Sequence, residues 1–401
     1  MIQEGIRLAV EAKDLTSEMA NDIMDEMMSG EAAPSQMAAF LTAMRMKGET
    51  KDELVGFVRS MRSRATKVRA SPGAIDLCGT GGDGMSTFNI STVSAFVVAA
   101  AGASVAKHGN RAVSSRSGSA DMLMALGIPT DLNHEGVERC LGDTGIGFMF
   151  APEFHRSMRN IAPTRRELGI RTFFNILGPM ANPAFVKRQL IGVYDPKLGP
   201  IMAEVLNDLG TEHAMIVNGS GMDEITTLGP TEITELREGR IDHHVISPSE
   251  FGLDLAERSE LVGGSAMDNA RAAIDVLRGE ESHRSDIVAL NSGAALYLAG
   301  KAADIHEGLS IAQKTLRSGD AIAKLKQFHD SCVEFESKTQ LEADVLQLRG
   351  ERIQPKVLKA RCAELSADLY HQISSIDARA LLTSWQPPNA ASSSRRVARL
   401  V

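Results

Sequence analysis

The first seventy residues carry apolar side chains at the three- and four-residue spacing that is typical of short amphipathic helices. Two such stripes follow one another, formed by Ala20, Ile23, Met24 and Met27 and by Met37, Phe40, Leu41 and Met44. Each stripe is followed by a glycine, Gly30 or Gly48, which commonly ends a helix. A third helix is predicted to begin at Thr50, because Thr50 and Glu53 have the spacing of a capping box.

From residue 74 the pattern changes to short apolar runs that alternate with helical segments rich in small residues. Strands are predicted at 74–78, 104–107, 146–150, 190–193, 214–217 and 243–245, with helices beginning near Ile90 and Ser119. This alternation indicates βαβ units, so we predict an α/β fold. A small N-terminal helical domain precedes a larger α/β domain with a mainly parallel central sheet flanked by helices. Such sheets bind ligands at the carboxyl ends of their strands.

The same patterns place the domain boundaries. A basic segment, 62–69, and the Ser-Pro-Gly sequence at 71–73 are typical of a linker. We therefore predict a helical domain at 1–70 and an α/β phosphoribosyl-binding domain at 74–325, the ligand class resting on the resemblance described below. Residues 326–401 form a helical, charged C-terminal extension, and 386–396 have the composition of a disordered tail. The sequence indicates no partner for this extension.

Composition narrows the function. The chain has 401 residues, with 43 basic and 51 acidic side chains and a net charge of −8. This charge and a pI of about 5.8 argue against general binding to nucleic acid or anionic membranes. The apolar part of 85–106 is shorter than the ~20 residues of a membrane span. The four cysteines form no CxxC pair, which is typical of a reducing compartment. We predict a soluble, cytoplasmic protein.

A glycine-rich loop, Gly79-Thr80-Gly81-Gly82-Asp83-Gly84, directly follows the first predicted strand. It matches GxGxxG, but the next strand ends in Lys107-His108, where a dinucleotide-binding fold needs an acid. A P-loop fails as well, because Met85 stands where its lysine belongs. Two interpretations stay open: an ordinary tight turn, or an anion site formed by backbone amides and the start of the next helix. The density of glycine favours the anion site.

A second loop, residues 107–119, contains cations, hydroxyls and amides and almost no apolar side chains. A solvated basic loop is the ordinary interpretation of such a run. In an acidic protein, however, a cationic loop after one strand and a glycine loop after another favour a cradle for a polyanion. Two phosphates with a sugar between them would fit. Such a ligand normally brings Mg²⁺, and Asp223-Glu224, after a further predicted strand, could bind it.

These motifs resemble those of the anthranilate phosphoribosyltransferases over about residues 1–325. The resemblance is carried by Asp76-Leu77-Cys78 with the glycine loop, 87–92, the run KHGNRAVSSRSGSAD at 107–121, 151–155, 165–172, 175–179 and Asp223-Glu224. It implies transfer of a phosphoribosyl group from phosphoribosyl pyrophosphate to the amine of anthranilate. It further implies a helical domain completed by a segment near 160–180, and a homodimer.

The resemblance also implies site residues. Donor contacts would be Gly79, Gly82, Asp83, Thr87, Asn89, Ser91, Thr92, Lys107, Ser115 and Ser119. Ser91, Asp223 and Glu224 would hold Mg²⁺, and Gly79, Asn110 and Arg165 would contact anthranilate. Lys107 and His108 are the predicted catalytic residues. Lys107 would neutralise the departing pyrophosphate, whereas His108 could donate a hydrogen bond or accept a proton.

The sequence departs from the family pattern at Met124, usually Glu, and at Arg156, usually Pro, and by its C-terminal extension. Two other functions compete with the transferase. A pyrimidine nucleoside phosphorylase has a similar fold and a Lys-His loop, but it uses inorganic phosphate and needs no paired acids for magnesium. A noncatalytic nucleic-acid-binding relative is disfavoured by the acidic pI.

Overall fold

The computed structural model describes residues 1–112 and 116–350. The chain divides into two compact units, Met1–Cys332 and one that starts at Val333. Everything discussed below lies in the first unit. The predicted donor contact Ser115 and the predicted tail at 386–396 lie outside the described residues. Within the described ranges, no helix is both long enough and apolar enough to cross a membrane.

The N-terminal helices are α1 (Ile2–Val10), α2 (Ser17–Ser29), α3 (Pro34–Lys47) and α4 (Lys51–Arg64). The two predicted apolar stripes lie on α2 and α3 and are buried. The predicted capping box is confirmed at the start of α4, where Glu53 Oε2 accepts the Thr50 N–H at 2.8 Å and Thr50 Oγ1 accepts the Glu53 N–H at 3.4 Å. Glu53 Oε1 also accepts the Leu15 N–H at 2.9 Å, which connects α4 to the α1–α2 loop.

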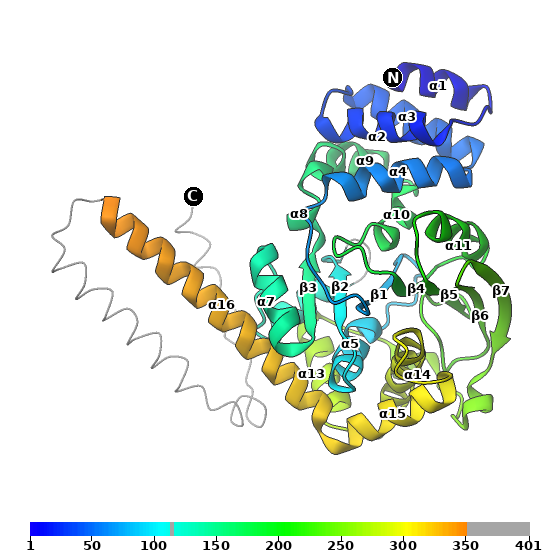
Figure 1. Cartoon of the computed structure of the whole chain (residues 1–401). Helices are drawn as coiled ribbons and strands as arrows, with labels where there is room; N and C mark the ends of the chain where they lie inside the picture. The colour runs from blue at the N-terminus through cyan, green and yellow to red at the C-terminus, as the bar shows by residue number, and fades with distance from the viewer. Residues whose placement is uncertain (113–115, 351–401) are drawn as a thin grey trace. The chain divides into compact units, whose positions relative to one another are not determined.

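A later segment packs into this bundle. It contains α8 (Ala151–Phe154), the short 3₁₀ helix η1 (Arg156–Asn160), α9 (Ala162–Leu168) and α10 (Phe174–Met180). The Phe173 ring stacks on Phe57 of α4 with centroids 4.3 Å apart and meets Phe40 of α3 edge-on at 6.2 Å. Figure 1 shows α9 and α10 beside α1–α4 at one end of the unit. Arg165 is thereby attached to the helical bundle.

In the described ranges, one seven-stranded sheet has the order β3-β2-β1-β4-β5-β6-β7. The strands are β1 (Ile75–Gly79), β2 (Val105–Gly109), β3 (Ile146–Phe150), β4 (Arg188–Gly192), β5 (His213–Gly219), β6 (Thr231–Arg237) and β7 (Arg240–Ile246). The first five strands in this order, β3, β2, β1, β4 and β5, are parallel to one another. Strand β6 is antiparallel to β5, and β7 is antiparallel to β6. The predicted mainly parallel sheet is therefore confirmed. The prediction missed β6 and assigned only the second half of β7.

Helices cover both faces of the sheet. On one face, α5 (Ile90–Ala100) packs on β1 and β2, and α14 (His283–Leu298) packs on β4 and β5. On the other face, α11 (Leu198–Asp208) packs on β5 and β6, and its apolar side chains join the core of the bundle. The remaining helices are α6 (Ser119–Ala125), α7 (His134–Thr144), η2 (Pro248–Phe251), α12 (Arg258–Leu261), α13 (Ala266–Leu277) and α15 (Ile305–Ser318).

The last helix of the described residues, α16 (Asp320–Gly350), starts inside the first unit. Leu325, Phe328 and Cys332 are buried, and the Phe328 ring lies 5.8 Å from that of Phe96. Lys324 Nζ donates to the Thr144 carbonyl at 2.8 Å, which satisfies the end of α7. The compact unit therefore includes 326–332, the first seven residues of the predicted C-terminal extension. The buried side chains there are spaced among polar ones, which hid their burial in the sequence.

Candidate functional site

Three of the predicted loops follow parallel strands of the sheet. The glycine loop follows β1, the cationic loop follows β2, and the acidic loop follows β5, with β4 between β1 and β5. Because parallel strands point in the same direction, their carboxyl ends lie at one edge of the sheet. Segments that are up to 142 residues apart in sequence, Gly81 and Asp223, meet there in a hydrogen bond.

Asp223 sits directly against the ends of β1 and β4. Its Oδ2 accepts the Gly81 N–H at 2.7 Å. A Cβ at Gly79 would lie 2.3 Å from Asp223 Oδ2, and a Cβ at Gly192 would lie 1.5 Å from the Asp223 carbonyl oxygen. Only glycine at these two strand ends leaves room for the acidic loop. Sequence analysis missed Gly192, and its only signal was a glycine at the end of a predicted buried strand.

The second acid, Glu224, faces the start of α5. Its Oε1 accepts the Ser91 N–H at 3.1 Å, in the first turn of that helix. A third acid, Asp83, accepts the Asp223 N–H at 3.4 Å. Burial raises the pKa of Asp223, and Asp83 raises it further. Burial also raises the pKa of Glu224, followed by repulsion from Asp223. Asp83, Asp223 and Glu224 are partly buried. They therefore form an acidic cluster in which a negative charge on one side chain makes ionisation of its neighbours less favourable.

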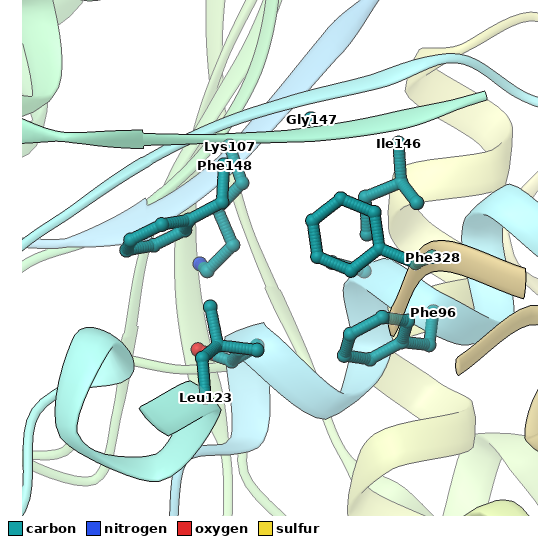
Figure 2. Close-up of a pocket in the computed structure, with 9 residues that line it drawn as sticks. Phe96, Lys107, Leu123, Ile146, Gly147, Phe148 and Phe328 are labelled. Atoms are coloured by element: carbon teal, nitrogen blue, oxygen red, sulfur yellow. The ribbon is translucent and has the colours of Figure 1, made fainter. Parts of the chain in front are cut away.

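Lys107 is the cation that reaches this group. It is 3% exposed, and its Nζ donates to the Leu77 carbonyl and to Ser91 Oγ, the latter at 3.2 Å. Figure 2 shows its side chain together with Phe148 and Leu123. These residues line a cavity of about 10 Å³. That cavity has an apolar lining and is too small to solvate an ammonium group. Burial accordingly lowers the pKa of Lys107, while Asp76 opposes the shift.

Asp76 and Asn182 form a buried polar pair behind Lys107. Asn182 Nδ2 donates to Asp76 Oδ2 at 2.7 Å and to the Ala106 carbonyl at 2.9 Å. The other Asp76 oxygen accepts the His108 N–H at 3.2 Å. Burial raises the pKa of Asp76, and the charge of Lys107 opposes this rise. These bonds hold β1, β2 and the segment after α10 together directly beneath the two predicted catalytic residues.

His108 is held as a neutral imidazole. Its ring centroid lies 5.1 Å from that of His155, and both side chains are buried. Burial and, to a smaller extent, the neighbouring His155 together lower the pKa of His108 to about 3. Burial also lowers the pKa of His155 to about 4. At neutral pH neither ring is an imidazolium that could act as a general acid, and a base with a pKa near 3 is weak.

The remaining predicted donor contacts lie in two connected loops. Asn89 precedes α5, and its Nδ2 donates to the Ser117 carbonyl at 3.2 Å. Ser119 Oγ donates to the Asn110 carbonyl at 3.1 Å, at the start of α6. Thr87 forms a β-bridge with Val262. Thr92 is buried one turn into α5, beside the cavity next to Lys107.

The two predicted acceptor side chains are not joined. Asn110 is exposed and its Oδ1 accepts the Arg111 N–H at 2.7 Å. The Arg165 guanidinium lies 4.8 Å from the centroid of the Phe174 ring, and burial lowers its pKa. Within 1–112 and 116–350, no carboxylate pairs with Arg165, and no hydrogen bond connects it to Asn110. A further residue, Arg171, was missed: it donates to the Gly82 carbonyl and lies 4.1 Å from the Tyr194 ring centroid.

The donor set suits Mg²⁺. In the part of the chain that the structure describes, no three His, Cys, Asp or Glu side chains converge closely enough to hold an ion unaided. Mg²⁺ characteristically takes one or two carboxylates and completes its shell with water and ligand oxygens. Asp223 and Glu224 supply such carboxylates, and their raised pKa values show that added positive charge would stabilise both anions.

Comparison with known proteins matches both parts of the first unit to the same family. Residues 71–322 match the model of the glycosyl transferase family a/b domain, and residues 3–65 match the helical bundle domain of the same family. An anthranilate phosphoribosyltransferase of Anaeromyxobacter sp. (strain K) is 50% identical over 328 residues, which is 82% of this chain and 97% of the relative.

Two solved structures have the same fold. Anthranilate phosphoribosyltransferase from Thermus thermophilus is 40% identical with a TM-score of 0.78, covering 82% of this chain and 99% of its own. The Saccharomyces cerevisiae enzyme, solved in complex with PRPP and Mg, is 26% identical with a TM-score of 0.76, covering 83% and 98%.

Proposed function

The chain belongs to the anthranilate phosphoribosyltransferase family, and from this premise we propose how its residues divide the reaction. It transfers the phosphoribosyl group of phosphoribosyl pyrophosphate (PRPP) to the amine of anthranilate. The products are N-(5-phosphoribosyl)anthranilate and pyrophosphate, in the second step of tryptophan biosynthesis from chorismate. The observation that carries the residue assignment is the meeting of Gly81 with Asp223 and of Ser91 with Glu224 at one sheet edge.

PRPP would lie between the glycine loop and the cationic loop. The backbone amides of the glycine loop and the start of α5 suit its pyrophosphate, and Lys107 supplies a fixed positive charge. Mg²⁺ is the cofactor, and Asp223, Glu224 and Ser91 would hold it. When bound, the ion supplies positive charge that stabilises the leaving pyrophosphate. Asp83, against the Asp223 backbone, keeps the acidic loop in place.

The reaction exchanges one bond at the ribose anomeric carbon. The bond to the pyrophosphate oxygen breaks, the ribose gains oxocarbenium character, and the anthranilate nitrogen forms the new bond. The proton lost from nitrogen leaves to water or to pyrophosphate oxygen. An aromatic amine is nucleophilic without deprotonation, so no strong base is needed. The low pKa of His108 supports a hydrogen-bonding role for its ring and disfavours its use as a base.

Anthranilate would bind against Gly79, Asn110 and Arg165. Arg165 has no carboxylate partner among the described residues and could pair with the anthranilate carboxylate. Arg165 is attached to the helical bundle, whereas Asn110 belongs to the α/β part of the unit. Movement of the bundle toward the sheet edge would complete this subsite and exclude water, which could otherwise capture the ribosyl cation.

A pyrimidine nucleoside phosphorylase is the competing function. It uses inorganic phosphate, for which one cation and backbone amides suffice. Without a metal ion, the acid pair of Asp223 and Glu224 has raised pKa values and contributes no positive charge that would bind phosphate. The paired acids therefore favour the transferase, in agreement with the relatives' names.

Anthranilate fluorescence tests the proposed function directly. With PRPP and Mg²⁺ present, the fluorescence of anthranilate should decay, and chelating the metal with EDTA should stop the decay. A second reaction with a pyrimidine nucleoside and inorganic phosphate should give no free base. Constant fluorescence together with phosphorolysis of the nucleoside would replace the transferase by the competing function.

We further propose a cytoplasmic homodimer. Large apolar side chains of the bundle, Met1, Val10 and Met46, are 57%, 72% and 84% exposed, and a second copy could cover them. Light scattering after size-exclusion chromatography should then give twice the chain mass of 43.0 kDa. A mass of one chain at micromolar concentration would contradict the dimer.

A further inference from the structure

Two side-chain amides connect three loops around the proposed donor site. Asn269, in the first turn of α13, is 2% exposed. Its Oδ1 accepts the Gly264 N–H at 2.8 Å, and its Nδ2 donates to Asn89 Oδ1 at 2.9 Å. Asn89 Nδ2 in turn donates to the Ser117 carbonyl at 3.2 Å. The relay therefore runs from a backbone N–H, through two amides, to a backbone carbonyl.

The backbone groups at the two ends fix the direction of both amides. The Gly264 N–H can only donate, so Asn269 must present its oxygen there and its NH₂ group to Asn89. The Ser117 carbonyl can only accept, so Asn89 must present its NH₂ group there and its oxygen to Asn269. Rotation of either amide would place two donors or two acceptors face to face.

Asn269 also lies close to the backbone hydrogen bonds that connect segment 261–264 to segment 86–88, which we call the donor loop. The Gly263 N–H donates to the Ser86 carbonyl at 2.8 Å, and the Phe88 N–H donates to the Leu261 carbonyl at 3.2 Å. Segment 261–264 thus lies alongside segment 86–88, and Asn269 connects the end of one to Asn89 at the end of the other. The backbone bonds fix the path of the donor loop, and Asn269 acts on the Asn89 side chain.

We propose that Asn269 is a positioning residue for the phosphoribosyl donor, which it never touches. It holds the Asn89 amide so that the remaining N–H of Asn89, and not its oxygen, faces the phosphate oxygens. A polyanion accepts hydrogen bonds and repels a carbonyl dipole, so this orientation sets donor affinity. The inference rests on the proposed function, because it takes Asn89 as a donor contact.

Two substitutions separate this role from simple packing. Asn269→Asp has the same shape and still accepts from Gly264, but it cannot donate to Asn89. The Asn89 amide must then rotate, turning its oxygen away from the relay and toward the Ser117 carbonyl and the anion. Asn269→Ala removes both bonds and leaves Asn89 free to turn. If Asn269 served packing alone, Asn269→Asp would bind PRPP more tightly than Asn269→Ala. If the relay sets the Asn89 amide, Asn269→Ala binds PRPP more tightly than Asn269→Asp.

The experiment measures KM for PRPP and for anthranilate, and calorimetric binding of PRPP with Mg²⁺, in variants whose thermal melting shows that they fold. We expect Asn269→Ala to raise the KM and Kd for PRPP about tenfold, the effect of one hydrogen bond. Asn269→Asp should raise both further, and KM for anthranilate should stay unchanged. The matched control is Asp275→Ala, an exposed position on α13 that should bind PRPP as the wild type does.

A double variant tests whether Asn269 acts through Asn89. Asn89→Ala with Asn269→Ala should bind PRPP no more weakly than Asn89→Ala alone. Additive losses, or tighter PRPP binding by Asn269→Asp than by Asn269→Ala, would overturn the positioning role. Wild-type protein that binds no PRPP would instead overturn the proposed function, so the two failures are distinguishable.

Discussion

The donor and acceptor halves of the proposed site differ in how completely they are assembled. On the donor half, Lys107 is buried and Asp223 and Glu224 are partly buried, and each has hydrogen-bond partners from another strand or loop. On the acceptor half, Asn110 is exposed, and the Arg165 guanidinium lies over the Phe174 ring with no carboxylate partner among the described residues. The donor half belongs to one edge of the sheet, where hydrogen bonds connect its loops, whereas the acceptor half is divided between the sheet and the bundle.

This difference has a physical reason. The donor carries several charges, so preformed amides and cations can bind it without reorganisation. Anthranilate is small and carries one carboxylate, so its subsite can form when the bundle moves. The comparison therefore predicts large effects on turnover from the donor half and smaller, substrate-specific effects from the acceptor half.

The largest effect is expected for Asp223→Asn with Glu224→Gln. Loss of both carboxylates removes the proposed metal site, and turnover should fall by at least about 10³-fold. Turnover is followed by anthranilate fluorescence over a range of Mg²⁺ concentrations. Glu232→Gln with Asp242→Asn, on the exposed sides of β6 and β7, is the matched control and should behave as the wild type. Unchanged magnesium dependence in the first variant would remove these acids from the site.

Lys107→Met comes next. The substitution keeps the buried stem but removes the charge beside the leaving pyrophosphate, so kcat should fall by about 10²-fold. Lys187→Met, at an exposed lysine that pairs with Glu212, provides the control. A kcat within the range of that control would show that Lys107 serves only the fold.

Arg165→Ala tests the acceptor half. We expect KM for anthranilate to rise about tenfold, the value of one charge-assisted contact, while KM for PRPP changes little. Arg166→Ala is the control, because Arg166 is the next residue on α9 and is exposed. Equal changes in both KM values would show that Arg165 supports the bundle and does not recognise anthranilate.

A prediction on acid stability, separate from turnover, concerns two buried histidines. The folded protein holds His108 and His155 with pKa values of about 3 and about 4, below the ordinary value of 6.5. Below pH 6.5 the unfolded chain therefore binds protons that the folded protein does not, and stability falls as pH falls toward 4. His155→Gln should reduce this pH slope by about 1.4 kcal/mol per pH unit, the value of one proton. Urea unfolding between pH 4 and 7 measures the slope, and an unchanged slope would contradict the depressed pKa of His155.

Periodicity and turn chemistry predicted most of the fold. The strand at 146–150 has the predicted bounds, and the helices near Ile90 and Ser119 begin as predicted. Strand β6 was missed because Thr231–Arg237 has only two apolar side chains, Ile233 and Leu236, among polar ones. Its turn to β7 at Glu238-Gly239, both with positive φ, was the signal that could have found the hairpin.

Some residues of the candidate site could likewise be predicted from the sequence, and others could not. Loops rich in glycine, cations or acids are local features, so Gly79, Lys107 and Asp223 could be found from sequence. Gly192 and Asn182 could not, because each acts on a residue far along the chain. An asparagine on a helix resembles any other polar position until its partner is known. Asn269, which is 180 residues from Asn89, is the clearest case.

The most direct test of the account is a crystal structure of the protein with PRPP and Mg²⁺. The account predicts the pyrophosphate against the loop at 79–84 and Lys107, with the metal between it and Asp223-Glu224. PRPP bound at any other place on the molecule, or a metal held away from these two acids, would contradict the central claim.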